Sequence, residues 1–144
     1  AEAIMQAERI WRQKQQGISE SEYELSQIDS MEGHAFEYWC ADILRENGFK
    51  NVEVTQGSGD QGVDVLAEKD GIKYAIQCKC YSSDLGNTPV QEVNAGKIIY
   101  HCHIGVVMTN RYFTSGAKKA AEATSVLLWD RSKLKELINN KAKE

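Results

Sequence analysis

Two strand-like segments joined by an Asp-Gly pair constrain the fold of this chain more than any other feature. Residues 63–67 and 72–81 lie on either side of Lys69-Asp70-Gly71. An Asp-Gly pair between two such segments is a strong hairpin signal, because both residues accept positive φ angles. We therefore predict an antiparallel pair of strands, around which the rest of the chain must build a sheet.

Residues 1–28 differ from the rest of the chain, because they are polar and rich in Glu and Gln. They predict a helix that breaks at Gly17, followed by a short helix that Ser19 can cap. We interpret this segment as an N-terminal helical extension or linker. Residues 29–144 are then expected to form the domain itself.

The order of the remaining elements predicts the fold class. Asp29 or Ser30 can cap a helix that Gly48 ends. The other predicted elements, besides the hairpin, are a strand through 52–54, a helix over 89–100, a strand over 104–109, a helix over 114–123, a strand over 126–129 and a helix from residue 132. Helical crossovers favour parallel pairing, so we predict an α/β fold with a mixed sheet.

Size and composition indicate one ordinary domain. The chain has 144 residues and a mass of 16.2 kDa. Its apolar runs fall far short of the ~20 residues that span a membrane, and its N-terminus lacks the pattern of a secretory signal. We expect a cytoplasmic protein without membrane contact. The net charge of −4 argues against a protein that coats DNA, but allows one face to bind nucleic acid.

The cysteines predict no disulfide scaffold. The chain carries Cys40, Cys78, Cys80 and Cys102. A zinc site built with His101 and His103 is the alternative, but a Cys-x-Cys pair inside a strand has the wrong spacing for it. We predict buried, reduced cysteines.

Alternation along residues 72–81 brings polar groups together. Cys78 and Cys80 fall on the predicted core face, while Gln77 and Lys79 fall on the opposite face. The hairpin allows Asp64 to lie beside them. Carboxylate and amide oxygens suit a hard cation, and a nearby lysine can act on a water or a phosphate. Taken singly, a strand-end acid and a solvated lysine remain the ordinary alternatives.

Two motifs on either side of the hairpin carry a resemblance to a known family. They are Gly59-Asp60-Gln61-Gly62-Val63-Asp64-Val65 and Gln77-Cys78-Lys79-Cys80-Tyr81. Together they resemble the catalytic signature of Mrr-type restriction endonucleases, which belong to the PD-(D/E)xK nuclease superfamily. The resemblance covers residues 30 to about 138. It implies a restriction-endonuclease-like fold, a central mixed β-sheet flanked by helices, which agrees with the predicted order of elements.

The resemblance also implies roles for individual residues. Asp64 is then the principal metal ligand, Lys79 the catalytic lysine, and Gln77 occupies a position that many relatives fill with Glu. Glu37 matches a helical acid of the site, although an ordinary surface glutamate is the alternative. The implied cofactor is Mg²⁺ (or Mn²⁺), with the backbone carbonyl of Cys78 as a further ligand. Because Gln carries no charge, we expect weaker metal binding in the absence of substrate.

Three further polar residues receive weaker expectations. Asp60 is expected to brace the glycine-rich turn rather than to bind metal. A histidine on the helix surface is the more common case for His34, and support of a metal ligand is the alternative. Gln91 matches a polar position of the family and is expected to contact substrate or water.

A cationic stretch predicts the DNA-binding face. Residues 97–121 contain Lys97, Arg111, Lys118 and Lys119 and no Asp or Glu. Such local positive charge is what phosphate binding requires, and a solvated helix face is the alternative.

These features predict a metal-dependent endodeoxyribonuclease that hydrolyses double-stranded DNA, with a restriction-type role in defence against foreign or modified DNA. One alternative is a catalytically silent DNA-binding module with the same fold. Another is a structure-specific, resolvase-like nuclease, which would act as a homodimer with two sites. Because the chain is short, we expect target recognition to reside on an additional domain outside this sequence.

Overall fold

The computed structural model describes residues 2–55 and 62–141, leaving aside the side chains of residues 13–16. In chain order the elements are α1 (Glu2–Gln16), α2 (Glu20–Ile28), α3 (Gly33–Glu46), β1 (Lys50–Val54), β2 (Val65–Lys69), β3 (Ile72–Lys79), α4 (Thr88–Ile99), β4 (Ile104–Thr109), α5 (Ser115–Thr124), β5 (Leu127–Trp129) and α6 (Arg131–Lys141). Within the described ranges, no helix has both the length and the apolar character that crossing a membrane requires.

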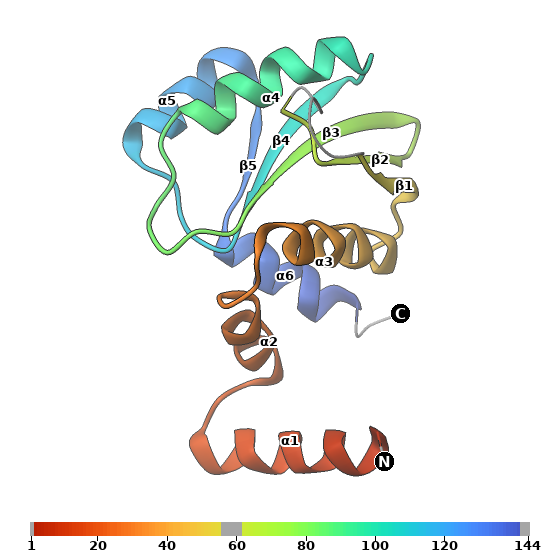
Figure 1. Cartoon of the computed structure of the whole chain (residues 1–144), viewed down its shortest axis with the longest axis vertical. Helices are drawn as coiled ribbons and strands as arrows, with labels where there is room; N and C mark the ends of the chain where they lie inside the picture. The colour runs from red at the N-terminus through yellow and green to blue at the C-terminus, as the bar shows by residue number, and fades with distance from the viewer. Residues whose placement is uncertain (1, 56–61, 142–144) are drawn as a thin grey trace.

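The sheet has five strands in the order β1-β2-β3-β4-β5 (Figure 1). Strands β1, β2 and β3 pair antiparallel, while β3, β4 and β5 pair parallel. The predicted turn closes the β2–β3 hairpin, with Asp70 at φ 53° and Gly71 at φ 80°. The parallel pairs follow from the α4 and α5 crossovers. The predicted α/β fold with a mixed sheet is confirmed.

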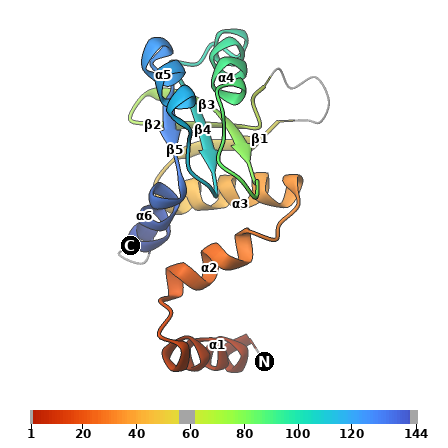
Figure 2. The ribbon, with the colours of Figure 1, turned by 90° about the vertical axis from the view of Figure 1, so that its left-hand side faces the viewer.

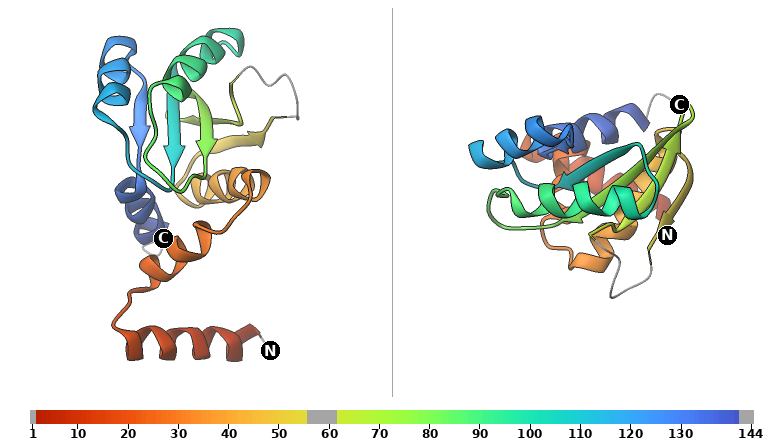
Figure 3. Two further views of the ribbon diagram at one scale, coloured as in Figure 1. Left: turned by 60° about the vertical axis from the view of Figure 1, so that its left-hand side comes forward. Right: turned by 90° about the horizontal axis from the view of Figure 1, so that it is seen from above.

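Helices cover both faces of this sheet (Figures 1 and 3). On one face, α3 and α6 pack against side chains that include Ile76 and Met108. On the other face, α4 and α5 pack against side chains that include Ala75 and Val107. Strands joined by helical crossovers are buried on both sides, because each crossover lays a helix on the sheet.

The double covering corrects one expectation about β3. The predicted alternation is confirmed, with Ile76 and Cys78 in one core and Ala75 in the other. The second face is not solvent-exposed, however, because α4 lies over it. Gln77, on this face, is only 3% exposed.

The N-terminal segment consists of two helices with different relations to the domain. The break at Gly17 and the Ser19 cap are both found as predicted, the Ser19 hydroxyl accepting a hydrogen bond from the Glu22 N–H at 3.2 Å. Helix α2 buries Leu25 and Ile28 in the core that α3 and α6 share. Helix α1 stands apart from the domain (Figure 2). Of the predicted extension, therefore, only α1 lies outside the packed body.

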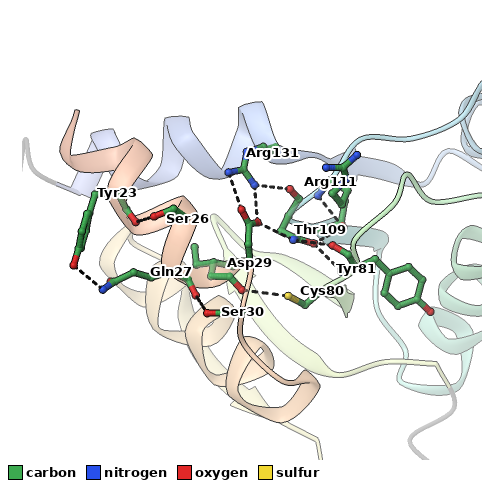
Figure 4. A network of polar contacts seen from close by, with 12 residues as sticks. Tyr23, Ser26, Gln27, Asp29, Ser30, Cys80, Tyr81, Thr109, Arg111 and Arg131 are labelled. Carbon is green, nitrogen blue, oxygen red and sulfur yellow. Dashed lines mark hydrogen bonds and ion pairs between the residues drawn. The ribbon is translucent and has the colours of Figure 1, made fainter. Parts of the chain in front are cut away.

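Helix α3 begins later than predicted. Glu32 caps it, accepting a hydrogen bond from the Ala35 N–H at 2.7 Å. Asp29 instead ends α2. Its carboxylate pairs with Arg131, at 2.8 Å from Nη1 and 3.1 Å from Nη2, as Figure 4 shows. Burial alone would raise the pKa of Asp29, but hydrogen bonds from Arg131 and Asn110 hold it below its usual value. Asp29 therefore pairs with Arg131, which is distant in sequence, instead of capping α3 as predicted.

Asn110 ties the end of β3 to α2 and explains why β3 stops before residue 81. Its Oδ1 accepts the Tyr81 N–H at 2.9 Å, and its Nδ2 donates to the Tyr81 carbonyl at 3.0 Å. The same Nδ2 donates to Asp29 at 2.9 Å. A buried side chain thus replaces the next rung of the β3–β4 ladder. Figure 4 shows Asp29 and Arg131 close to this strand end at Tyr81.

We predict that Asn110→Ala lowers the free energy of unfolding by about 3 kcal/mol, because it leaves buried polar partners unpaired. Asn139→Ala, at an exposed position of α6, is the matched control and should change stability by less than ~0.5 kcal/mol. Urea denaturation measures both. Equal stabilities for the two variants would show that Asn110 does not hold the strand end.

Candidate active site

Asp64 lies where β2 begins, beside the C-terminal half of β3. Its N–H donates to the Ile76 carbonyl at 2.8 Å, and its carbonyl accepts the Thr55 N–H at 2.9 Å, so the backbone is held on both sides. Its carboxylate Oδ2 accepts the Cys78 N–H at 2.8 Å. These three bonds direct the carboxylate to the end of β3 that carries Lys79.

Gln77 is a buried amide whose nitrogen has hydrogen-bond partners while its oxygen has none among the described residues. Its Nε2 donates to the Gly62 carbonyl at 3.0 Å and to Glu92 Oε1 on α4 at 3.4 Å. Its Oε1 is buried and has no hydrogen-bond partner among the described residues. A buried amide oxygen without a partner is costly, and each such atom calls for an explanation such as an ion.

Lys79 ends β3 and lines an open pocket of about 380 Å³. Its Nζ lies 5.9 Å from the centre of the Tyr81 ring. The rest of the pocket comes from the loop after β3 and the first turns of α4, including Asp84, Pro89 and Glu92. A solvent-accessible ammonium at the rim of a pocket can meet a phosphate.

Glu37 lies on α3, with a side chain that is only 17% exposed. His34 lies one turn before it, with Nδ1 3.6 Å from Glu37 Oε1, and is itself mostly exposed. The pKa of the Cys78 thiol is raised far above its usual value, first by burial, then by the neighbouring Cys40, and further by the charges of Asp64 and Glu37. Both predicted acids therefore act electrostatically on the Cys78 thiol, and Asp64 also contacts the Cys78 backbone.

The cysteines are free thiols, as predicted. Cys40 and Cys78 are buried, but Cys80 and Cys102 are only partly buried, so the prediction of burial holds for two of the four. The zinc alternative finds no support: His103 Nδ1 accepts the Lys73 N–H at 2.9 Å. Among the described residues, no three or more His, Cys, Asp and Glu side chains gather closely enough to hold a metal ion.

The donor set nevertheless fits a single hard cation. Gln77 offers an amide oxygen rather than a carboxylate. Its partnerless Oε1 and the Asp64 carboxylate both belong to the paired ends of β2 and β3. Mg²⁺ typically binds one or two carboxylates and completes its shell with water and phosphate oxygens. The residues present therefore fit one Mg²⁺ or Mn²⁺ better than a carboxylate-rich cluster.

The predicted DNA-binding residues separate into two groups. Lys118 and Lys119 are exposed on α5, which starts beside the pocket loop because Phe113 pairs with Leu85. Arg111 pairs with Asp84 of that loop at 3.3 Å. All three lie at the Lys79 end of the sheet.

Lys97 lies elsewhere. It occupies the last turn of α4, beside Gly105 at the start of β4. Gly105 pairs with Ala75, on the half of β3 away from Lys79. Gln91 is exposed on α4, and Asp60 falls outside the described residues.

Glu92 is a residue of this region that sequence patterns did not single out. It follows Gln91, and its side chain rather than that of Gln91 meets Gln77 and the Lys79 pocket. The sequence carried a signal for Glu92, because Pro89 and Gly96, both buried, are its neighbours at helical spacing. Gln91 lies on the solvent side of the same helix.

Residues 28–138 match the family model Mrr_cat, which describes restriction endonucleases. The chain belongs to this family, which confirms the resemblance. It is a restriction-endonuclease-like domain, and the family is one of nucleases. No curated protein matches the chain.

Three solved structures share the fold. A protein of unknown function, AF1548, is similar with a TM-score of 0.62 and 24% identity over 74% of this chain and 65% of its own. MspJI restriction endonuclease, in complex with a 27-mer oligonucleotide, is similar with a TM-score of 0.59 and 20% identity, over 82% of this chain and 31% of its own. The DNA modification-dependent restriction endonuclease AspBHI is similar with a TM-score of 0.61 and 18% identity, over 86% of this chain and 36% of its own. This chain thus spans less than two thirds of each of these proteins.

The burial of Cys78 predicts its reactivity. Because the thiolate is the nucleophile and the Cys78 pKa is strongly raised, Cys40 and Cys78 should resist iodoacetamide in the native protein at pH 8. The half-buried Cys80 and Cys102 should react slowly and all four rapidly in urea, as followed by mass spectrometry of peptides. Native-state alkylation of Cys78 at the rate of a small thiol would contradict the packing described.

Proposed function

We propose that this domain is a metal-dependent endodeoxyribonuclease that acts on double-stranded DNA. One observation carries the proposal: the hairpin brings the Asp64 carboxylate, the partnerless Gln77 Oε1 and Lys79 to one end of the sheet. Family membership supports the nuclease class. The metal and the choice of DNA are inferences from the chemistry of these groups.

Asp64 and Gln77 Oε1 would hold the cation, with Glu37 and the backbone carbonyl of Cys78 as further oxygen ligands. A bound Mg²⁺ or Mn²⁺ supplies a Lewis acid that polarises a phosphoryl oxygen and lowers the pKa of water. The Cys78 N–H orients the Asp64 carboxylate through Oδ2. His34 would support Glu37 from the solvent side, and Asp60 would brace the turn before Asp64.

Lys79 would act on substrate rather than on metal. From the rim of the pocket, its ammonium can hold the attacking water in position and stabilise the negative charge that develops on the phosphate. Because Gln77 supplies an uncharged oxygen in place of a second strand carboxylate, more of the metal affinity is left to the substrate phosphate. Tight binding is therefore expected only with DNA present.

Lys118, Lys119 and Arg111 would bind the DNA backbone, because they lie at the Lys79 end of the sheet. Gln91, exposed on α4, would contact substrate or water. The position of Lys97 at the other end argues against its direct participation. MspJI, which shares the fold, is known in complex with an oligonucleotide, and this supports the proposal of a DNA substrate.

A restriction-type role against foreign or modified DNA, in the cytoplasm, completes the proposal. We further propose that residues 29–144 act as the catalytic unit, with target recognition on another domain and dimerisation for cleavage of both strands. The coverage of MspJI and AspBHI, which are each much longer, supports an additional domain. A silent DNA-binding module is the competing function, and the presence of Asp64, Gln77 and Lys79 together favours the enzyme.

Nicking of supercoiled plasmid tests the proposal. We expect activity with Mg²⁺ or Mn²⁺, none with EDTA, and loss by at least about a thousandfold in both Asp64→Ala and Lys79→Ala. The variants should differ in metal binding, because only Asp64→Ala removes a ligand. Lys73→Ala, at an exposed position of the same strand, is the matched control. Cleavage in EDTA, or a fully active Lys79→Ala, would contradict the mechanism.

The proposed backbone contacts predict a salt dependence that two lysines control. Lys118→Glu/Lys119→Glu should weaken duplex binding and reduce the slope of log affinity against log salt by about 2, because two phosphate contacts are lost. Lys97→Glu, at the opposite end of the sheet, should leave the slope unchanged. Fluorescence anisotropy between 50 and ~200 mM salt measures this. An unchanged slope in Lys118→Glu/Lys119→Glu with a reduced slope in Lys97→Glu would place the DNA at the Lys97 end of the sheet.

A further inference from the structure

We propose that Glu92 is a positioning residue that fixes the orientation of the Gln77 amide, so that Oε1 rather than Nε2 faces the cation site. This inference rests on the proposed function, because it concerns how the same site holds its metal. It assigns a role to an acid on α4 that lies outside the Asp-Gln-Lys set.

The need for such a residue follows from the chemistry of glutamine. The two ends of a carboxamide are nearly equal in size, and rotation by 180° exchanges an oxygen acceptor with an NH₂ donor. Only the oxygen can bind a cation. A glutamate at the same position presents oxygen either way, so a site that uses Gln77 must select one orientation.

The surroundings of Gln77 select it. The two groups that meet Nε2 are the Gly62 carbonyl at 3.0 Å and Glu92 Oε1 at 3.4 Å. Both are acceptors, and together they match the two N–H bonds of the amide. In the rotated state, Oε1 would face a carbonyl oxygen and a carboxylate inside a site where Gln77 is 3% exposed. Glu92 is solvent-exposed, but the Gln77 amide is buried, so turning its oxygen toward two acceptors costs free energy and the observed orientation is preferred.

The backbone at Glu92 also positions the other acceptor. A Cβ on Gly62 would lie 2.9 Å from the Glu92 carbonyl oxygen, and Gly62 has φ +78°. Glycine is therefore required on both counts, close approach and left-handed backbone. The chain at Gly62 rests directly on α4 at Glu92, which sets the spacing of the two acceptors around Nε2.

This arrangement has a consequence for restoring the more common acid. Gln77→Glu would place a new carboxylate against Glu92 and the Gly62 carbonyl, with both donors lost. The added charge should therefore bring little gain in metal affinity. Combining it with Glu92→Gln supplies an NH₂ donor from α4 to the new Glu, so the double variant should bind metal better than Gln77→Glu alone.

The test is Mn²⁺ binding without DNA, followed by the electron paramagnetic resonance signal of free Mn²⁺ up to millimolar concentration. Glu92→Ala should weaken binding by about tenfold, the usual effect of removing a group that orients a ligand. Glu92→Gln should stay within about twofold of the wild type, because its amide oxygen still accepts from Nε2. Glu122→Ala, which removes an exposed carboxylate on α5, is the matched control. Melting temperatures without metal show whether each variant folds.

The outcomes separate this inference from the proposed function. Wild-type affinity in a folded Glu92→Ala overturns it, as does a double variant no better than Gln77→Glu, or a wild type that binds no Mn²⁺. A purely structural role for Glu92 predicts lower melting temperatures with unchanged Mn²⁺ affinity, which also overturns it. If the variants behave as expected but the wild type does not cleave DNA with Mn²⁺, the proposed nuclease fails while the role of Glu92 stands.

Discussion

The antiparallel pairing of β2 with β3 is the interaction on which the rest of the site depends. It sets Val65 opposite Ile76, which brings the start of β2 to the Lys79 end of β3. The Asp64 carboxylate then accepts the Cys78 N–H at 2.8 Å. A shift of this register by one residue would turn Gln77 and Lys79 to the other face of the sheet, because side chains alternate along a strand. The tight turn at Asp70-Gly71 prevents that shift.

Covering the sheet on both faces gives this site its character. Because α4 lies over β3, Gln77 is a buried amide rather than a surface side chain. Its neighbours accept hydrogen bonds from Nε2 and so fix which way the amide is turned. Burial makes a partnerless oxygen costly in the protein alone. A cation at that oxygen would remove the cost. The unfavourable free energy of the unpaired Gln77 Oε1 is thus the physical basis for assigning metal binding to this site.

Local signals predicted what depends on local chemistry. The Asp70-Gly71 turn, the break at Gly17 and the Ser19 cap each follow from residues adjacent in sequence, and all are found. The family resemblance likewise brought Asp64 and Lys79 into one hypothesis. The prediction that failed involves a partner distant in sequence, because Asp29 pairs with Arg131 instead of capping a helix. The position of Lys97 at the far end of the sheet likewise depends on strand pairing that local patterns do not show. Glu92 was missed because its partner, Gln77, lies on another element.

The central claim is that the ends of β2 and β3 form one cation site, and anomalous diffraction locates it most directly. Crystals of the protein grown with Mn²⁺ and a short DNA duplex, with Lys79→Ala to prevent cleavage, would show the metal by its anomalous scattering. Our account predicts a peak in contact with an Asp64 carboxylate oxygen and Gln77 Oε1, with a phosphate oxygen of the duplex completing the shell. A peak bound elsewhere, or Gln77 with its Nε2 facing an empty site while DNA is bound, would contradict it.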